Sequence, residues 1–385
     1  MNLDRRFPGI ASMQGCARRR IPRFAWDYMA GAIGREYLLE ENCQRLDRVK
    51  LRPRYLVDEA DNPDPRISIL GEDCNLPFAV APLGLNGLIW PNAGPLLAAA
   101  ARDHGIPFCL SSVATCSIEQ IGDIGGKLWY QHYSTVDDDI NADMLRRAVA
   151  AGFSKLIITV DIPTTTRRER DLRNGLSVPP EVSIATFFDI LPCPAWAWGT
   201  LRHGLPKFLN LLPYLPEGLS LAELGTRITA LLEGHVTPLK LAWYRAHWPG
   251  ELIVKGILDA RDAAVCRELG ADAIVVSNHG GRQLDAAETS LDALPAIRSE
   301  VGDDFPLLAD GGIRSGLDIA RFLASGADFV LLGRAFMFAL GALGAAGPTH
   351  AMQILGAELR MTLAQLGCPS IAKLEEFRID QSQAP

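Results

Sequence analysis

The sequence predicts an α/β protein built on a (β/α)8 TIM barrel, with an N-terminal helical segment and an insertion between strands four and five. Three observations predict this fold. Eight short apolar runs recur along the chain, helix-like stretches separate them, and glycine repeatedly stands between a helix and the next run. Nearly continuous apolar strands are typical of a parallel sheet that helices cover. We interpret residues 1–385 as one barrel domain, because single α/β barrels often exceed the usual domain length.

The eight apolar runs give the expected strands. They are Phe78–Ala81, Phe108–Ser111, Leu128–Tyr133, Leu156–Val160, Leu252–Lys255, Ala273–Ser277, Pro306–Asp310 and Phe329–Leu332. Gly152, Gly270 and Gly326 each close a helix before the next strand, a position that favours glycine. The alternative is a doubly wound open sheet, which would usually carry G-x-G-x-x-G after its first strand, and that motif is not present.

Two segments lie outside the barrel repeat. Residues 1–75 predict leading helices and a short cap over one barrel end. Residues 176–235 predict an insertion, in which Trp196 and Trp198 stand near Arg202, His203 and Lys207. Tryptophan beside basic residues is typical of a membrane interface, and a lid packed on the barrel is the equal alternative. The uncharged stretches of the insertion are too short to span a bilayer.

Composition excludes several classes of protein. The net charge of −7, from 38 Lys and Arg against 45 Asp and Glu, argues against a nucleic-acid partner. None of the eight cysteines forms C-x-x-C or a zinc-type group with histidine, so we expect no metal and eight reduced thiols. The first residues lack the apolar core of a secretory signal. We therefore expect a cytoplasmic protein, with a peripheral position on the inner face of the cell membrane as the alternative.

Polar residues gather where the predicted strands end, which is the active face of a TIM barrel. The ends of strands four to eight carry Asp161, Lys255, Ser277–Asp285, Asp310–Arg314 and Gly333–Arg334. The last two ends predict a phosphate site. Gly311 and Gly312 allow close backbone approach there, and Arg314 and Arg334 supply charge.

The strand-six end predicts acid–base chemistry on an anion. His279 is a candidate proton acceptor near neutral pH, and Arg282 can bind a carboxylate with two hydrogen bonds. Asp161 could hold the imidazole and stabilise its charged form. Lys255 ends an apolar strand and needs a partner. It could form a Schiff base or neutralise an electron-rich cofactor, and the residues alone leave both readings open.

Three motifs carry a family resemblance. Ser-Asn-His-Gly-Gly-Arg-Gln-Leu-Asp at 277–285, Asp-Gly-Gly-Ile-Arg at 310–314 and Leu-Gly-Arg at 332–334 resemble the FMN-dependent α-hydroxy acid dehydrogenase and oxidase family. The resemblance extends from about Ile21 to about Leu374 and is weakest in the insertion. Within the family, residues 194–206 and 362–369 are most similar to the branch that oxidises (S)-mandelate.

The resemblance implies FMN as cofactor and a 2-hydroxy acid as substrate, oxidised to the 2-oxo acid with loss of the α-hydrogen as a hydride or a proton. It makes His279 the base with Asp161 as its partner, and it makes Lys255 the stabiliser of anionic reduced flavin. It assigns the substrate to Tyr28, Gly84, Val113, Tyr133, Arg168 and Arg282. It assigns FMN to Ala81, Pro82, Leu83, Gly84, Ser111, Gln131, Thr159, Lys255, Ser277, Asp310, Gly311, Gly312, Arg314, Gly333 and Arg334.

Three residues depart from the family pattern. Leu83 stands where threonine is common, so one hydrogen bond to the flavin is expected to be missing. Val113 stands where the glycolate-oxidising branch has tryptophan, which favours a bulky aromatic substrate. Gly84 stands where oxidases tend to have alanine, which implies a dehydrogenase that passes electrons to a membrane quinone.

Other functions are also compatible with the sequence. Within the family they are an L-lactate dehydrogenase and an oxygen-using oxidase; outside it they are a Schiff-base aldolase or isomerase barrel and a binding barrel without catalysis. The resemblance also implies a homo-oligomer, with a tetramer as the common form.

Overall fold

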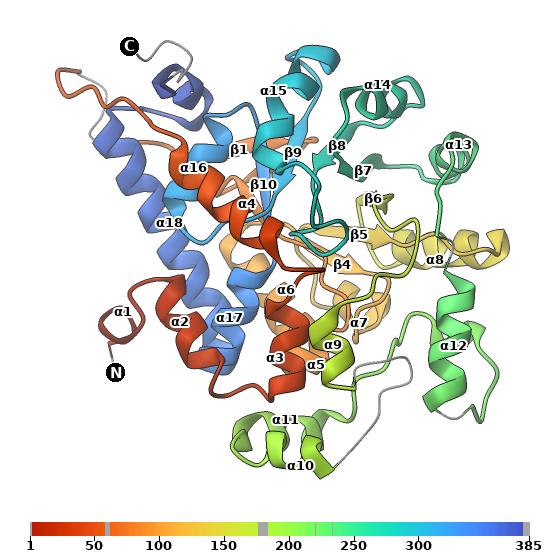
Figure 1. Ribbon diagram of the computed structural model, residues 1–385. Coiled ribbons are helices and arrows are strands. Elements are labelled where there is room, and N and C mark those ends of the chain that lie inside the picture. Colours follow the sequence, from red (N-terminus) through yellow and green to blue (C-terminus); the bar gives the residue numbers. More distant parts are fainter. Residues whose placement is uncertain (1, 58–61, 176–183, 220, 233, 380–385) are drawn as a thin grey trace.

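The computed structural model describes residues 2–57, 62–175, 184–219, 221–232 and 234–379. Within these ranges eight parallel strands close into a barrel in the order β10-β3-β4-β5-β6-β7-β8-β9, so the predicted fold is confirmed (Figure 1). The strands are β3 (Phe78–Val80), β4 (Phe108–Ser111), β5 (Leu128–His132), β6 (Lys155–Thr159), β7 (Glu251–Ile257), β8 (Ala273–Val276), β9 (Leu307–Asp310) and β10 (Phe329–Leu332).

Predicted and observed strand ends agree within two residues. The largest difference is at β7, which continues past Lys255 to Ile257 through an irregularity in its pairing with β8. Apolar periodicity cannot show this extension, because the extra residues include Gly256, which has a φ of +106°.

Alternate side chains of each strand point to opposite sides of the barrel wall. Trp129, Ile157, Ile253 and Phe329 belong to the cluster that fills the interior. Their strand neighbours pack outward against the covering helices, which explains the continuous apolar runs. The covering helices are α6 (Ala93–His104), α7 (Ile118–Gly122), α8 (Asp138–Ala150), α13 (Pro238–His247), α14 (Ala260–Glu268), α15 (Ser290–Val301), α16 (Gly316–Leu323), α17 (Arg334–Leu343) and α18 (Gly347–Leu366).

The N-terminal segment contributes to both ends of the barrel. It contains α1 (Leu3–Arg6), α2 (Ile10–Ala17), α3 (Arg23–Ala30), α4 (Tyr37–Arg48) and the hairpin of β1 (Ile67–Ile69) and β2 (Glu72–Cys74). In the hairpin, Glu72 accepts hydrogen bonds from Trp129 and Ser154, beside the first residues of β5 and β6. At the other end, α3 and α4 lie beside the loops that follow the strands.

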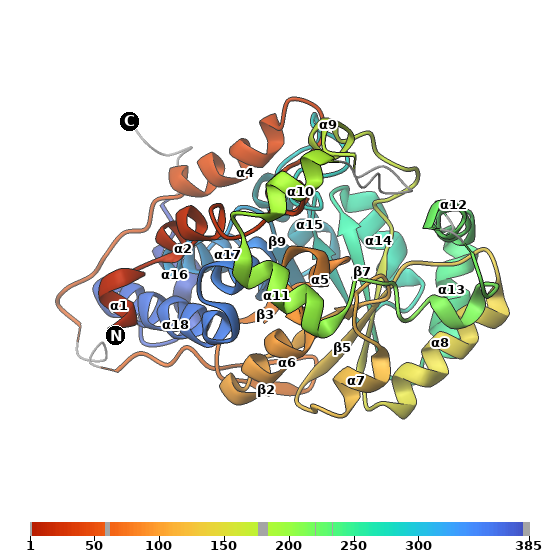
Figure 2. The same cartoon turned by 90° about the horizontal axis from the view of Figure 1, so that it is seen from below.

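The segment between β6 and β7 carries the helices that the barrel repeat does not explain. They are α9 (Glu169–Arg173), α10 (Ile184–Ile190), α11 (Pro194–His203), the 3-10 turn η1 (Leu212–Tyr214) and α12 (Leu221–Leu231). Figure 2 shows α10 and α11 as an outer layer on the side seen from below. The first predicted residues of the insertion, 176–183, lie outside the described residues.

The two tryptophans of α11 differ in environment. Trp198 is 67% exposed, as an interfacial residue would be. Trp196 is buried, packs edge-on against Phe24 and donates a hydrogen bond to the Leu88 carbonyl at 3.0 Å. The interfacial interpretation is therefore wrong for Trp196, whose burial against Phe24 of α3 and Leu88 of α5 instead fits the alternative of a packed lid.

All eight cysteines are free, and Cys109 and Cys116 are buried as expected.

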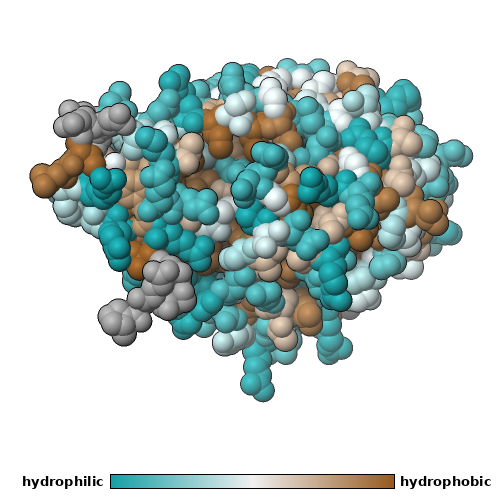
Figure 3. All heavy atoms as spheres, turned by 90° about the horizontal axis from the view of Figure 1, so that it is seen from above, coloured by the Kyte–Doolittle hydropathy of each residue, from teal (hydrophilic) through white to brown (hydrophobic). Residues whose placement is uncertain are grey.

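On the face seen from above, hydrophilic residues predominate and hydrophobic ones form separate groups (Figure 3). In the part of the chain that the structure describes, no helix combines the length and apolar character that crossing a membrane requires.

Three further short elements lie after β3 and on either side of α18. Helix α5 (Asn86–Ile89) follows β3, and the 3-10 turns η2 (Gly344–Ala346) and η3 (Ile371–Phe377) flank α18.

Candidate active site

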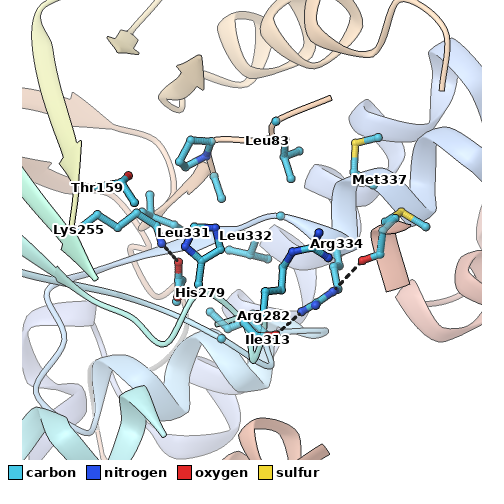
Figure 4. Close-up of a pocket in the computed structure, with 18 of the residues that line it drawn as sticks. Leu83, Thr159, Lys255, His279, Arg282, Ile313, Leu331, Leu332, Arg334 and Met337 are labelled. Carbon is cyan, nitrogen blue, oxygen red and sulfur yellow. Dashed lines mark hydrogen bonds and ion pairs between the residues drawn. The ribbon is translucent and has the colours of Figure 1, made fainter. Parts of the chain in front are cut away.

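A cavity opens at the C-terminal ends of the barrel strands (Figure 4). Most of the residues predicted for the site line it. They are Tyr28, Ala81, Pro82, Leu83, Gly84, Val113, Tyr133, Thr159, Arg168, Lys255, His279, Arg282, Asp310, Gly311, Gly312, Arg314, Gly333 and Arg334. The other four predicted residues, Ser111, Gln131, Asp161 and Ser277, are not in the lining but hydrogen-bond to residues of it or to one another.

His279 and Asp161 form the central pair. The imidazole Nδ1 lies 3.0 and 3.1 Å from the two carboxylate oxygens of Asp161, which leaves Nε2 for the cavity. His279 has a φ of +56°, and Gly280 and Gly281 follow it with φ of +63° and +77°. A left-handed backbone conformation is uncommon for histidine and persists only where surrounding contacts impose it. The two glycines accommodate the same tight loop.

The pKa values of both groups are lowered, for different reasons. Burial lowers the pKa of His279 below its usual value, and the opposing effect of Asp161 is smaller. Burial alone would raise the pKa of Asp161, but the charge and hydrogen bond of His279, with Lys255, outweigh it and lower that pKa. The pair therefore rests as a neutral imidazole beside a carboxylate, which is the state a general base requires.

Two neighbours of Asp161 were not predicted. A Cβ at Gly256 would lie 2.5 Å from the Asp161 Cβ, so only glycine leaves room for the carboxylate at the end of β7. Gln283 donates from Nε2 to the Asp161 carbonyl oxygen at 3.0 Å. Both stand beside residues already singled out, Lys255 and Arg282, but the sequence does not show that they converge on Asp161.

Lys255 lies at the centre of a buried charged group. Its Nζ is 2.9 Å from an Asp310 carboxylate oxygen and donates to Ser277 Oγ at 2.8 Å. Ser277 in turn donates to Asp310 at 2.6 Å and accepts the His279 backbone N–H at 3.0 Å. Burial lowers the pKa of Lys255, but Asp310 and Asp161 outweigh it and raise that pKa. A permanently charged ammonium suits an electron-rich cofactor and is unfavourable for Schiff-base formation.

A second polar chain runs across the ends of β4, β5 and β6. Ser111 donates to Gln131 Oε1 at 2.6 Å, and Gln131 donates to Thr159 Oγ1 at 3.0 Å. Thr159 lines the cavity, and its hydroxyl group is held in place there by the hydrogen bonds of Gln131 and Ser111. Leu83, in the loop after the adjacent strand β3, adds only an apolar side chain to the lining.

Arg314 and Arg334 occupy the end of the cavity next to the C-terminal ends of β9 and β10. Arg334 donates to the carbonyl oxygens of Met29, Gly280 and Gly31 at 2.9–3.0 Å, and Arg314 donates to its neighbour Ile313. Burial lowers the pKa of both. In the described ranges neither forms a salt bridge with a carboxylate. Helix α17 begins at Arg334, so its first N–H groups add to an anion site.

Arg168 and Arg282 form a second cationic group. Arg282 donates to the Tyr28 carbonyl at 2.7 Å and lies over the Tyr28 ring at 5.0 Å. Burial, followed by the like charge of Arg168, lowers its pKa to about 10. Arg168 Nε is buried and has no hydrogen-bond partner among the described residues. Two partly buried guanidiniums that repel each other are stabilised when an anion binds between them.

Gly84 and Val113 set the room available beside Tyr133. A Cβ at Gly84 would lie 2.8 Å from Val113 Cγ2, so the two residues are already in contact. Ile89 and Ile162 complete this apolar part of the lining and were not predicted. The sequence could not identify them, because an isolated isoleucine in a pocket wall looks the same as one in the hydrophobic core.

The fold and the site together define a barrel enzyme that binds a phosphate-bearing cofactor beside an acid–base pair. Residues 17–381 match the family described as FMN-dependent dehydrogenase, and the chain belongs to that family, whose cofactor is FMN. The resemblance drawn from the motifs is thereby confirmed.

Individual relatives divide between two substrates. An L-lactate dehydrogenase of Caulobacter vibrioides (strain NA1000 / CB15N) is 40% identical over 362 residues, which is 94% of each chain. The crystal structure of the "monotopic membrane protein (S)-mandelate dehydrogenase" matches with a TM-score of 0.91 at 34% identity, covering 97% of this chain and 99% of that one. A mandelate oxidase matches with a TM-score of 0.81 at 34% identity, covering 96% and 97%.

Proposed function

We propose that the protein oxidises (S)-mandelate or a related aromatic 2-hydroxy acid to the 2-oxo acid. The observation that carries the proposal is the His279–Asp161 pair, which faces the same cavity as Arg168, Arg282 and Lys255. A base next to two guanidiniums, of which only Arg168 has a carboxylate neighbour (Asp171 at 3.6 Å), suits a substrate that carries a carboxylate and loses a proton close to it.

The residues of the cavity fit FMN. Arg314, Arg334 and the start of α17 would hold the phosphate, because these partly buried cations lack carboxylate partners among the described residues. The backbone of residues 81–84, with the Ser111–Gln131–Thr159 chain, would hold the ring, and Asp310 the ribityl chain. Lys255 would place its positive charge beside the ring. FMN, when bound, accepts the two electrons that the substrate loses.

The protein residues supply proton transfer and orientation. His279 takes one proton from the substrate, either from the α-carbon or from the hydroxyl group, and Asp161 stabilises the resulting imidazolium. Arg168 and Arg282 bind the carboxylate, and the hydroxyl groups of Tyr28 and Tyr133 hydrogen-bond the substrate oxygens. Burial raises the pKa of Tyr133, so it stays a hydrogen-bond donor throughout the working pH range.

The side chain of the substrate separates two candidates. Val113 and Gly84 leave space for an aromatic group, and the mandelate dehydrogenase and mandelate oxidase structures are close in fold. L-Lactate is the second candidate, favoured by the Caulobacter relatives at 38–40% identity. The two acids should therefore be compared directly as substrates.

We also propose that a membrane quinone accepts the electrons and that the protein binds the inner face of the membrane through α10 and α11. Large apolar side chains are exposed on these helices and just beyond them, at Phe187, Phe188, Leu191, Trp198, Leu201 and Leu205. Exposed apolar groups of this size mark an interaction surface. The family resemblance further supports a homotetramer, which sedimentation would measure.

The first experiment is an anaerobic titration of the purified holoprotein with (S)-mandelate, following flavin absorbance at about 450 nm. We expect bleaching within the mixing time. Bleaching by L-lactate alone would move the substrate to the second candidate. A yellow protein that neither acid bleaches would contradict the proposed activity and leave the cofactor assignment intact.

Membrane binding is tested separately by flotation with vesicles of phosphatidylethanolamine and phosphatidylglycerol. A Phe188→Ser, Trp198→Ser, Leu201→Ser variant should float much less than the parent. Leu239→Ser is the control, since Leu239 is 84% exposed but lies on α13. Equal flotation of variant and parent would contradict the role of α10 and α11.

A further inference from the structure

Helix α9 lies outside the barrel and carries Arg168 at its N-terminal cap. It packs beside α3, as Figure 1 shows. A cluster that we call the latch joins the two: Asp27, Glu36, Arg170 and Asn174. Arg170 pairs with the Glu36 carboxylate and lies 3.7 Å from Asp27, while Asn174 Nδ2 donates to the other Asp27 oxygen at 2.7 Å.

The receiving side of the latch is itself fixed to the barrel. Arg282 and Arg334 donate to the backbone carbonyls of residues 28, 29 and 31, directly after Asp27. Glu36 adopts a φ of +62° and accepts the Ala32 N–H at 3.1 Å. A non-glycine residue with this left-handed backbone conformation requires contacts that hold it there. The acidic half of the latch is therefore presented from a rigid base.

Arg168 needs such support from outside its own contacts. Its Nε is buried without a hydrogen-bond partner among the described residues, and Asp171 is 3.6 Å from Nη1. Arg168 follows an irregular stretch after β6 and belongs to no strand. Arg170 and Asn174 lie two and six residues further along, so they fix α9 and with it the cap position of Arg168.

We propose that the latch is a positioning device for substrate binding: Arg170 and Asn174, through Asp27 and Glu36, hold Arg168 where it meets the substrate carboxylate. The inference rests on the proposed function, because it assumes that Arg168 binds this carboxylate. The latch residues do not touch the substrate. Their contribution is the pre-organisation of a guanidinium that would otherwise have to be ordered when the substrate binds.

The consequence is a change in binding more than in the chemical step. His279, Asp161 and Lys255 are held by strand ends and are independent of α9. Loss of the latch should therefore raise KM and leave kcat nearly unchanged, which is the signature of an interaction shared by ground state and transition state.

The test variant is Arg170→Met, which keeps most of the aliphatic stem that lies beside Gly31. We expect KM for (S)-mandelate to rise about fivefold, with kcat within about twofold of the parent, as for a half-buried ion pair. The dissociation constant of benzoylformate, which has no α-hydrogen, should rise by the same factor when it is measured by perturbation of the flavin spectrum. Arg170→Lys should recover part of the loss.

Two further variants make the test specific. Arg173→Met is the matched control, because Arg173 is on the same helix but is 71% exposed and pairs with Glu169; its KM should not change. Glu36→Gln keeps an oxygen for Ala32 N–H, and adding Arg170→Met to it should raise KM no further than Arg170→Met alone. Additive effects would contradict coupling through this pair.

Different experimental results would contradict the positioning role of the latch and the proposed function. If neither hydroxy acid bleaches the parent protein, the proposed function fails. If (S)-mandelate or L-lactate bleaches the parent, KM is measured with that acid. An Arg170→Met protein with unchanged KM and unchanged benzoylformate affinity would then overturn the positioning role. A fall in kcat with loss of bound flavin would also overturn it, because that result indicates general damage to the fold.

Discussion

The two sides of the cavity are built from different parts of the chain. On the barrel side, Lys255, His279 and Asp310 lie within strands or within three residues of a strand end and share hydrogen bonds through Ser277. On the outer side, Tyr28 belongs to α3 and Arg168 to the cap of α9, and an ion pair and a hydrogen bond to Asp27 join those helices. The barrel side therefore fixes the chemistry, while the outer side can vary to fit a substrate.

The largest effect should follow a change on the barrel side. His279→Gln removes the base and should slow flavin reduction by the hydroxy acid by about 10⁴-fold. FMN content should remain that of the parent, since His279 contributes no charge to the phosphate end. Stopped-flow absorbance measures the rate; a variant that is reduced at the parental rate would remove His279 as the base.

A change on the outer side should mainly weaken binding. Arg168→Met leaves Arg282 as a single cation for the carboxylate and should lower kcat/KM about 100-fold. The dissociation constant of benzoylformate should rise in parallel, whereas the rate of flavin reduction at saturating substrate should fall less. If saturating substrate does not recover most of the rate, Arg168 takes part in the chemical step and the comparison between the two sides breaks down.

The Asp161–His279 pair gives a pH prediction. Asp161 raises the pKa of His279 against the larger lowering effect of burial, so Asp161→Asn should lower that pKa further. The acidic limb of kcat/KM, where His279 becomes protonated, should move to lower pH. The rate at neutral pH should fall about 30-fold, since the imidazolium loses its partner. An acidic limb that moves to higher pH would contradict this arrangement.

The smallest effect concerns the fit of the substrate. Gly84→Ala would place a methyl group 2.8 Å from Val113 Cγ2, so Val113 must move into the cavity. We expect kcat/KM to fall about fivefold for (S)-mandelate and less for L-lactate, because only the larger acid needs that space. Adding Val113→Ala should restore the rate with mandelate. Equal losses for both acids would indicate that the substituent lies elsewhere.

The barrel side could be predicted almost completely from the sequence. Residues 277–285, 310–314 and 332–334 are contiguous motifs at predicted strand ends, and parallel strands bring their carboxyl ends to one face of the barrel. The outer side was predicted in part. Tyr28 and Arg168 came from the family resemblance, but the latch between Arg170, Asp27 and Glu36 joins residues more than 130 positions apart. No periodicity or motif connects them.

Apolar periodicity and glycine placement therefore determined the eight strands, and local motifs determined the candidates for base, phosphate and cofactor contacts. The tertiary structure alone decided that Trp196 is buried while Trp198 is exposed, that Gly256 makes room for Asp161, and that Arg170 and Asn174 join α9 to α3. The physical reason is the range of the interactions. Strand pattern and helix capping act over a few residues, whereas burial and ion pairing depend on which distant surfaces the closed barrel brings together.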